Sequence, residues 1–258
     1  MKLNVKEIKK LSCIKNSFYE DLKIEFLYHS NHLEGSTFSK ENLEKLLFEK
    51  KVDGEHFLDD VIETRNSLNV FDMVIKDCDK ELDKFMLFAW QRELKKDSVD
   101  DEIHNTGCWK KYENRLRNVD LKLAYPSEVD SMMYNLLMDY KETQNRTIED
   151  IAKFHYCFEK IHPFQDGNGR IGRFIILKQC IENDIDLISI DEQYSKKYKQ
   201  ALYKAQKTDD ISDLVDVFSK CQKRLEAKLK SYDEMIKLVK EEVSADKDIA
   251  DDFDDIDK

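Results

Sequence analysis

The sequence predicts an almost entirely helical protein made of one domain. Glycine and proline, which most often mark turns, occur only six times and twice in 258 residues. Apolar residues recur at three- and four-residue spacing along most of the chain, as in helices that bury one face. Because no internal repeat or Pro/Ser-rich linker divides the chain, we predict a single domain over 1–241. An acidic segment with few apolar anchors, 242–258, is predicted to be a disordered tail.

The first half of the chain contains five predicted helices. Apolar spacing places them at 3–15, 17–34, 40–50, 58–75 and 80–95. Gly35 is a stop signal for the second helix, and Ser39 is a suitable N-cap for the third. The helical periodicity is lost between 97 and 126. We predict a short β-hairpin there, at about 105–123.

The second half is predicted to be helical again. The expected helices cover about 126–141, 147–161, the stretch after 169, 191–206 and 211–241. Ser127 is a suitable cap for the first of them. The last helix is longer than usual, and its outer part could pack on the core or on a second copy of the chain, which leaves a homo-oligomer open.

Composition excludes several classes of protein. The formal charge of −11 and the lack of a long basic run argue against nucleic-acid binding. Six cysteines without a C-x-x-C pair indicate reduced thiols in a cytoplasmic protein. The first residues do not resemble a signal peptide, and no apolar run approaches membrane-spanning length, so we expect no membrane partner.

One stretch, 162–173, carries the chemistry: His-Pro-Phe-Gln-Asp-Gly-Asn-Gly-Arg-Ile-Gly-Arg. Pro163 ends the preceding helix, and the Asp-Gly and Asn-Gly pairs predict turns. The loop then leads main-chain amides into a new helix, where an anion is favoured. Arg170 and Arg173 lie in the first turn, where cations are unfavourable beside the positive end of the helix dipole. A bound polyphosphate would offset this unfavourable placement. The stretch therefore predicts a site for phosphate transfer.

This stretch resembles the motif of the Fic family, HPF-x-(D/E)-G-N-(G/K)-R-x-x-R, at every defined position. The resemblance implies a Fic-type helical domain that transfers a nucleotide monophosphate, usually AMP from ATP, to a protein hydroxyl. His162 would be the base, and Asp166 would hold Mg²⁺ on the nucleotide phosphates. The remaining implied roles are the anion hole (Gly167, Asn168, Gly169), the phosphate tail contacts (Arg170, Arg173) and the anchor of the loop in the core (Phe164).

Three further segments fit the same family. Ser30-x-x-x-Glu34-Gly35 matches its inhibitory-helix pattern, which implies that Glu34 pairs with Arg173 at the γ-phosphate position. Read alone, this segment is only a polar helix end. The expected hairpin lies where Fic proteins have a flap that pairs with the target by strand addition, although Lys110 stands where arginine is common. Tyr194 and Tyr198 are candidates for the adenine wall, or ordinary half-buried tyrosines.

The sequence as a whole predicts a self-inhibited enzyme that uses ATP and Mg²⁺. It would transfer AMP to Ser, Thr or Tyr hydroxyls of a protein target, including itself. Three alternatives remain: transfer of UMP, phosphocholine or phosphate; removal of AMP, with Glu34 orienting a water molecule; and an inert partner-binding scaffold. The target, the nucleotide selectivity, the oligomeric state, the role of the acidic tail and the signal that relieves inhibition are not encoded in any motif that we recognise.

Overall fold

The computed structural model describes residues 1–103, 106–115 and 120–254, with the backbone alone for 246–254. The described part is helical and contains no β-strand. In chain order the elements are α1 (Val5–Leu11), α2 (Phe18–Leu33), α3 (Lys40–Glu49), α4 (Leu58–Lys76), α5 (Lys84–Lys95), α6 (Val99–Glu102), α7 (Pro126–Glu142), α8 (Ile148–Ile161), α9 (Asn168–Glu182), η1 (Glu192–Tyr194), α10 (Ser195–Thr208), α11 (Ser212–Lys228), η2 (Lys230–Tyr232) and α12 (Asp233–Asp254).

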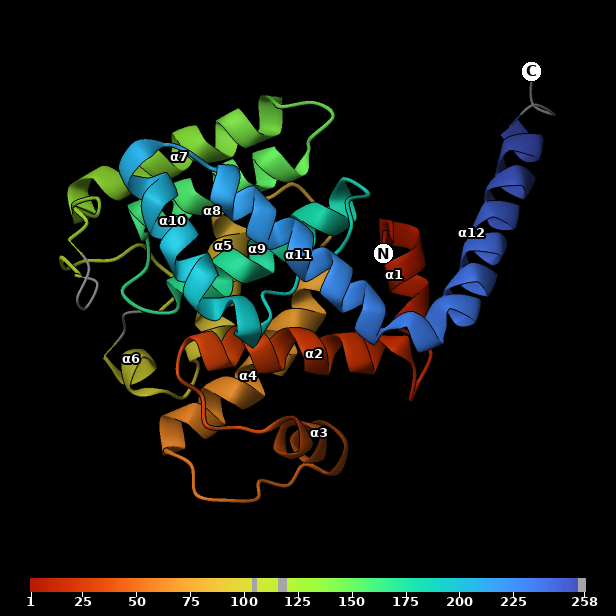
Figure 1. Cartoon of the computed structure of the whole chain (residues 1–258), viewed down its shortest axis with the longest axis horizontal. Coiled ribbons are helices and arrows are strands. Elements are labelled where there is room, and N and C mark those ends of the chain that lie inside the picture. The colour runs from red at the N-terminus through yellow and green to blue at the C-terminus, as the bar shows by residue number, and fades with distance from the viewer. Residues whose placement is uncertain (104–105, 116–119, 255–258) are drawn as a thin grey trace.

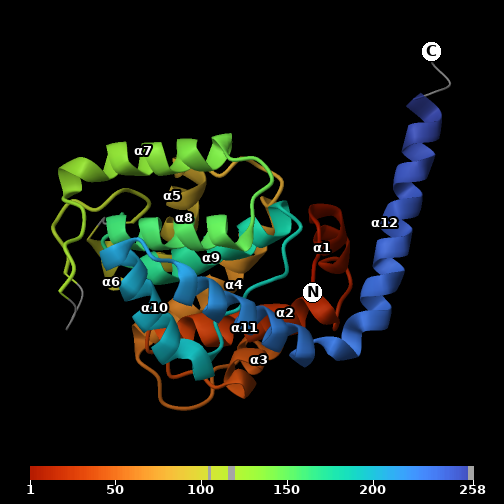
Figure 2. The ribbon, with the colours of Figure 1, turned by 45° about the horizontal axis from the view of Figure 1, so that its top comes forward.

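Helix α9 lies at the centre of this arrangement and is surrounded by other helices (Figure 1). It contacts α1, α2, α4, α5 and α8, and all of its residues except Gly169 and Glu182 are buried. Helix α7 covers the outer side of α8, as the turned view makes clear (Figure 2). The first turn of α9 follows the loop 162–167, so the position of α9 determines where that loop lies.

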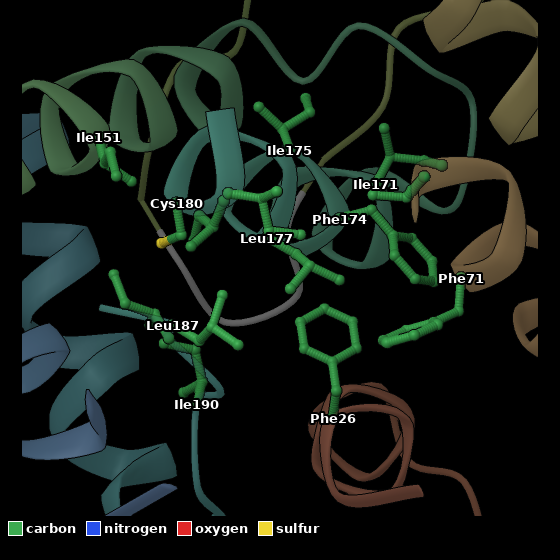
Figure 3. Packing of buried hydrophobic residues seen from close by; sticks show 14 of the residues in the cluster. Phe26, Phe71, Ile151, Ile171, Phe174, Ile175, Leu177, Cys180, Leu187 and Ile190 are labelled. Atoms are coloured by element: carbon green, nitrogen blue, oxygen red, sulfur yellow. The ribbon is translucent and has the colours of Figure 1, made fainter. Parts of the chain in front are cut away.

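Aromatic packing fixes α9 against α2 and α4. The ring centroid of Phe26 in α2 lies 5.4 Å from that of Phe174 in α9 and 5.7 Å from that of Phe71 in α4 (Figure 3). Such buried aromatic pairs contribute about 0.5–1.5 kcal/mol each beyond the area that they bury. The contact joins three helices that are far apart in sequence and that each supply one side of the candidate site.

Several predictions about local structure are wrong. The hairpin expected at 105–123 is absent from the described part of that segment, 106–115 and 120–123, which is irregular. Main-chain and side-chain groups of 110–114 bind residues 161–165 instead of forming a strand pair, as described below. The cap expected at Ser127 is also wrong, because Tyr125 is the N-cap of α7 and Pro126 occupies its first turn.

The long C-terminal helix expected over 211–241 is divided. Helix α11 ends where the Leu229 amide donates to the Leu225 carbonyl, the turn η2 follows, and α12 then leaves in a new direction (Figure 1). Helix α12 packs beside α1. The tail predicted to be disordered from 242 is helical as far as Asp254, and 255–258 lie outside the described residues.

Candidate active site

His162 occupies an unusual backbone conformation directly after α8. Its φ and ψ angles are 51° and 62°, in the left-handed region, and its amide donates to the Phe158 carbonyl at 2.8 Å. Pro163 disfavours the helical conformation for the preceding residue. A left-handed conformation is uncommon for residues other than glycine, although histidine adopts it more often than most, and such strain concentrates at functional sites. The chain thus turns sharply at His162 instead of continuing the helix.

The loop after His162 is closed by its own side chains. Phe164 is fully buried, and its ring centroid lies 5.3 Å from that of Trp109. The Asn168 side chain accepts a hydrogen bond from the Phe164 amide (2.8 Å) and donates to the Phe164 carbonyl (2.9 Å). Phe164 therefore lies in the core, where a side chain that anchors the loop is expected. The Asn168 side chain is used inside the loop, so only its main-chain amide remains for an anion.

The N-terminus of α9 offers main-chain donors for an anion. Gly167 precedes the helix with φ +84°, which favours glycine, and no side chain caps the helix start. The free amides of the first turn carry the positive end of the helix dipole. Gly169 is required for a different reason, because a Cβ atom there would lie 2.2 Å from Glu34 Oε1.

Arg173 contacts the end of α2. Its Nη2 donates to Glu34 Oε1 (2.6 Å) and to the Ser30 carbonyl (2.9 Å), and its Nε donates to Ser30 Oγ (2.9 Å). The Arg173 side chain is buried, whereas that of Glu34 is 40% exposed. Burial alone would raise the pKa of Glu34, but the Arg173 and Arg170 charges outweigh it and lower that pKa. Glu34 is therefore ionised at neutral pH.

Arg170 belongs to a second network that connects α4, α5 and α9. Glu63 in α4 contacts both Arg170 and Lys95, and the Lys95 ammonium also contacts Asp100 (2.7 Å) and Asp166 (2.5 Å). Neither Glu63 nor Lys95 was predicted from the sequence to belong to the site. The available signal was a lysine on the buried face of an amphipathic helix, which requires nearby acids.

The residues present fit a magnesium ion held at Asp166. The carboxylates of Glu63, Asp100 and Asp166 approach one another within 4.8 Å, but the Lys95 ammonium contacts all three, so together they do not form a free metal site. The ion pairs of Asp166 both involve Oδ2, and its side chain is 54% exposed. Mg²⁺ commonly binds one or two carboxylates together with substrate phosphates. Asp166 can provide such a carboxylate beside the N-terminus of α9.

The imidazole of His162 is held neutral. Burial, together with the neighbouring Lys110 ammonium, lowers the pKa of His162 to about 4. Glu159, one turn earlier in α8, places Oε2 3.7 Å from His162 Nδ1, and burial raises the pKa of Glu159 to about 8. At neutral pH the carboxyl is therefore protonated, and the imidazole is free to accept a proton.

A cavity of about 520 Å³ connects His162 and Glu159 with the contact between Glu34 and Arg173, whereas Asp166 and Arg170 are not among its lining residues. Its lining includes Glu34, Glu159, His162, Gly169, Arg173, Tyr198, Lys199, Leu202 and Tyr203. Tyr198 is buried, with its hydroxyl 2.7 Å from His155 Nε2, whereas Tyr194 is not among the lining residues. Tyr203 and Lys199 were missed by the sequence analysis. Lys199 donates to the Leu33 carbonyl (3.2 Å) and so links α10 to the end of α2.

Comparison with known proteins identifies the central part of the chain. Residues 81–180, from α5 through most of α9, match the model of the Fic/DOC family. This segment is therefore similar to a Fic/DOC domain. The match includes the whole stretch 162–173 but not α2, so Ser30 and Glu34 lie outside it.

Related proteins agree with this assignment. Over 64 residues the chain is 41% identical to a probable protein adenylyltransferase of Aquifex aeolicus, a segment that covers 24% of this chain and 19% of that protein. A Fic domain-containing signaling protein of Bacteroides thetaiotaomicron superimposes with a TM-score of 0.70 at 24% identity, covering 91% of this chain and 97% of that one. Fic-1 of C. elegans (residues 134–508) gives 0.68 at 17% identity, covering 91% and 72%. These solved structures show that the Fic fold extends over nearly the whole chain.

None of the described helices has the length and apolar composition that a membrane crossing requires.

Proposed function

We propose that this chain transfers AMP from ATP to a Ser, Thr or Tyr hydroxyl of a protein and that Glu34 restrains the reaction. The observation that carries the proposal is the cavity that brings His162, Arg173 and Gly169 at the start of α9 together. A neutral base and an anion-binding helix end are the two parts that nucleotide transfer to a hydroxyl needs. The name of the Aquifex relative points to the same activity.

In the proposed reaction, His162 takes the proton from the target hydroxyl as its oxygen attacks the α-phosphorus of ATP. The bond between the α-phosphorus and the bridging oxygen breaks, and pyrophosphate leaves. The amides at the start of α9, with Arg170 and Arg173, stabilise the phosphate charge and orient the triphosphate. Asp166 would hold Mg²⁺, which neutralises phosphate charge when it is bound.

The contact between α2 and α9 supports restraint of this reaction. Glu34 and Ser30 engage Nε and Nη2 of Arg173, the donors that a γ-phosphate would need. A carboxylate and a phosphate cannot use these donors together, so binding of the triphosphate in this place requires Glu34 to leave. The protein would then be active only when the end of α2 moves.

Labelled ATP separates this proposal from its alternatives. The Glu34→Gly variant and the wild type are incubated with Mg²⁺ and ATP labelled at either the α- or the γ-phosphate, with added protein substrates. We expect the α-label to become protein-bound in Glu34→Gly, and to be lost in Glu34→Gly/His162→Ala. Incorporation of the γ-label would indicate phosphate transfer instead. Incorporation of neither label, with UMP or phosphocholine donors also inactive, would leave removal of AMP and the scaffold; release of AMP from a protein that already carries it would distinguish these two.

The proposed role of Asp166 has its own test. Asp166→Asn should remove the dependence of ATP binding on Mg²⁺, measured by calorimetry with and without the ion in the Glu34→Gly background. Asp100→Asn is the matched control, because Asp100 contacts Lys95 but lies outside the loop. An unchanged Mg²⁺ dependence in Asp166→Asn would remove Asp166 from the metal role.

A further inference from the structure

Lys110 binds the chain on both sides of His162. Its side chain is only 4% exposed, and its Nζ donates to the Ile161 carbonyl (3.2 Å) and to Asn114 Oδ1 (2.9 Å). Its main-chain amide donates to the Pro163 carbonyl (2.8 Å). One residue thus holds the carbonyl before His162 and the carbonyl after it.

Neighbouring residues extend this contact into a clamp, the segment 110–114. Asn114 Nδ2 donates to the Phe164 carbonyl (3.0 Å), and the Tyr112 amide donates to Gln165 Oε1 (3.2 Å). The clamp therefore contacts 161–165 through both side-chain and main-chain groups. The hairpin was predicted here, and the long-range contacts explain why the described part of the segment forms no strand pair.

The clamp offsets two costs at the end of α8. The Ile161 carbonyl belongs to the last turn of the helix, where carbonyls lack a partner within the helix. A lysine near a helix C-terminus supplies both a donor and a favourable charge. The left-handed conformation of His162 costs about 1–3 kcal/mol and persists only where the surroundings enforce it. Fixed carbonyls on both sides of the residue provide that enforcement.

Lys110 also contributes to the charge around His162. Three charged groups act on the imidazole, namely Lys110 in the clamp, Glu34 at the end of α2 and Asp166 in the loop, and Glu159 Oε2 in α8 lies 3.7 Å from its Nδ1. The charges of Glu34 and Asp166 raise the pKa of His162, whereas that of Lys110 lowers it. Both acceptors of the Lys110 ammonium are neutral oxygens, and burial lowers the pKa of Lys110 to about 8, so it remains mostly charged at pH 7.

We propose that Lys110 is a positioning residue for His162, which fixes the backbone on both sides of the histidine and adds a buried positive charge near the imidazole. The inference rests on the base role proposed for His162. It adds a requirement that the 162–173 stretch does not contain: a buried cation supplied by the segment between α6 and α7.

The test compares Lys110→Met and Lys110→Arg in the Glu34→Gly background. Lys153→Met is the matched control, because Lys153 is exposed on α8. NMR of the His162 ring carbon follows its titration directly, and kcat and the KM for ATP are measured in parallel. In Lys110→Met we expect the titration midpoint of His162 to rise and kcat to fall by about 10-fold or more, with little change in KM. Lys110→Arg should keep the midpoint near that of the parent and retain more of the rate.

Two outcomes would overturn the proposal. One is a His162 midpoint and kcat in Lys110→Met that match those of Lys153→Met. The other is a loss in Lys110→Arg as large as that in Lys110→Met, which would reduce Lys110 to packing. If Lys110→Met does not fold, Lys110→Gln retains a donor for Ile161 and serves in its place. Because the NMR titration does not require turnover, an inactive Glu34→Gly parent would reject the proposed function and still leave the Lys110 inference testable.

Discussion

Arg170 and Arg173 lie one turn apart on α9 and are both buried, yet their acidic partners differ in kind. Arg170 contacts Glu63, whose side chain is 15% exposed and also contacts Lys95. Arg173 contacts Glu34, whose side chain is 40% exposed. Glu63 lies within the 19-residue helix α4, whereas Glu34 is the C-cap of α2 and is followed by Gly35 with φ +94°.

This difference distinguishes a fixed contact from a releasable one. Moving Glu63 would disturb α4 and separate two cations from one carboxylate. Moving Glu34 requires only that the chain after α2 turns at a glycine, where positive φ carries no steric cost. We therefore expect Arg170 to keep its partner and Arg173 to be able to exchange its own.

The largest expected difference between the two contacts concerns stability. Glu63→Gln should lower the free energy of unfolding by about 3 kcal/mol, because it removes the carboxylate that contacts both Arg170 and Lys95 and leaves buried Arg170 only the 3.8 Å contact to exposed Asp166. Glu34→Gln should cost about 1 kcal/mol or less, because Arg173 keeps both contacts to Ser30 and the lost carboxylate is partly solvated. Urea unfolding of the two variants measures both values, and equal losses would remove the distinction.

The second prediction concerns the rate of AMP transfer. Glu34→Gly should raise it about 10- to 100-fold, the range expected when a coupling of about 1–3 kcal/mol is removed. Arg173→Ala should not raise it, because that variant also lacks a triphosphate contact. The double variant should behave like Arg173→Ala alone, since both residues act through one contact. Initial rates of the four proteins form the cycle, and effects that simply multiply would place the action of Glu34 elsewhere.

These two contacts also show what the sequence can predict. Glycine and proline scarcity and helical periodicity predicted the fold class, because those signals are local. The resemblance of 162–173 and of the segment from Ser30 to Gly35 to the patterns of the Fic family implied Glu34 as the partner of Arg173, and the structure places the two side chains 2.6 Å apart. Glu63 and Lys95 could not be assigned, because a carboxylate in one helix and a lysine in another gain their meaning only when α4 and α5 pack together.

The hairpin prediction was wrong because long-range contacts, not local signals, determine the structure of this segment. Residues 97–126 lack helical periodicity, and a strand pair is the usual local alternative. Here the polar groups of the clamp, 110–114, bind a loop about 50 residues further along the chain. No local pattern encodes a long-range partner of this kind.

A smaller effect is expected at Ser30. Ser30→Ala removes one of the two Ser30 acceptors of Arg173 and leaves the Ser30 carbonyl and Glu34 in place. A single hydrogen bond contributes about 1 kcal/mol, so AMP transfer should rise about 5-fold, less than in Glu34→Gly. Ser131→Ala is the control, because Ser131 is exposed on α7 and bonds only within its own helix. A Ser30→Ala rate equal to that of the control would limit the restraint to Glu34.

The smallest effect is expected from mild acid, which should open neither contact. The pKa of Glu34 lies below the ordinary pKa of a glutamate. The Glu34 carboxylate is therefore charged at any pH above that ordinary pKa, and it loses its charge only as the pH falls through the lowered pKa. The pKa of His162 is also lowered, to about 4, so the imidazole remains about 97% unprotonated at pH 5.5. An ordinary histidine, with a pKa of about 6.5, would be only about 10% unprotonated there.

We therefore expect kcat/KM of Glu34→Gly, and the ratio of its rate to that of the wild type, to stay nearly constant between pH 7.5 and about 5.5. A tenfold fall in kcat/KM over this range would mean that His162 titrates normally. A wild-type rate that rises towards that of Glu34→Gly would mean that acid releases Glu34 from Arg173 while Arg170 remains paired.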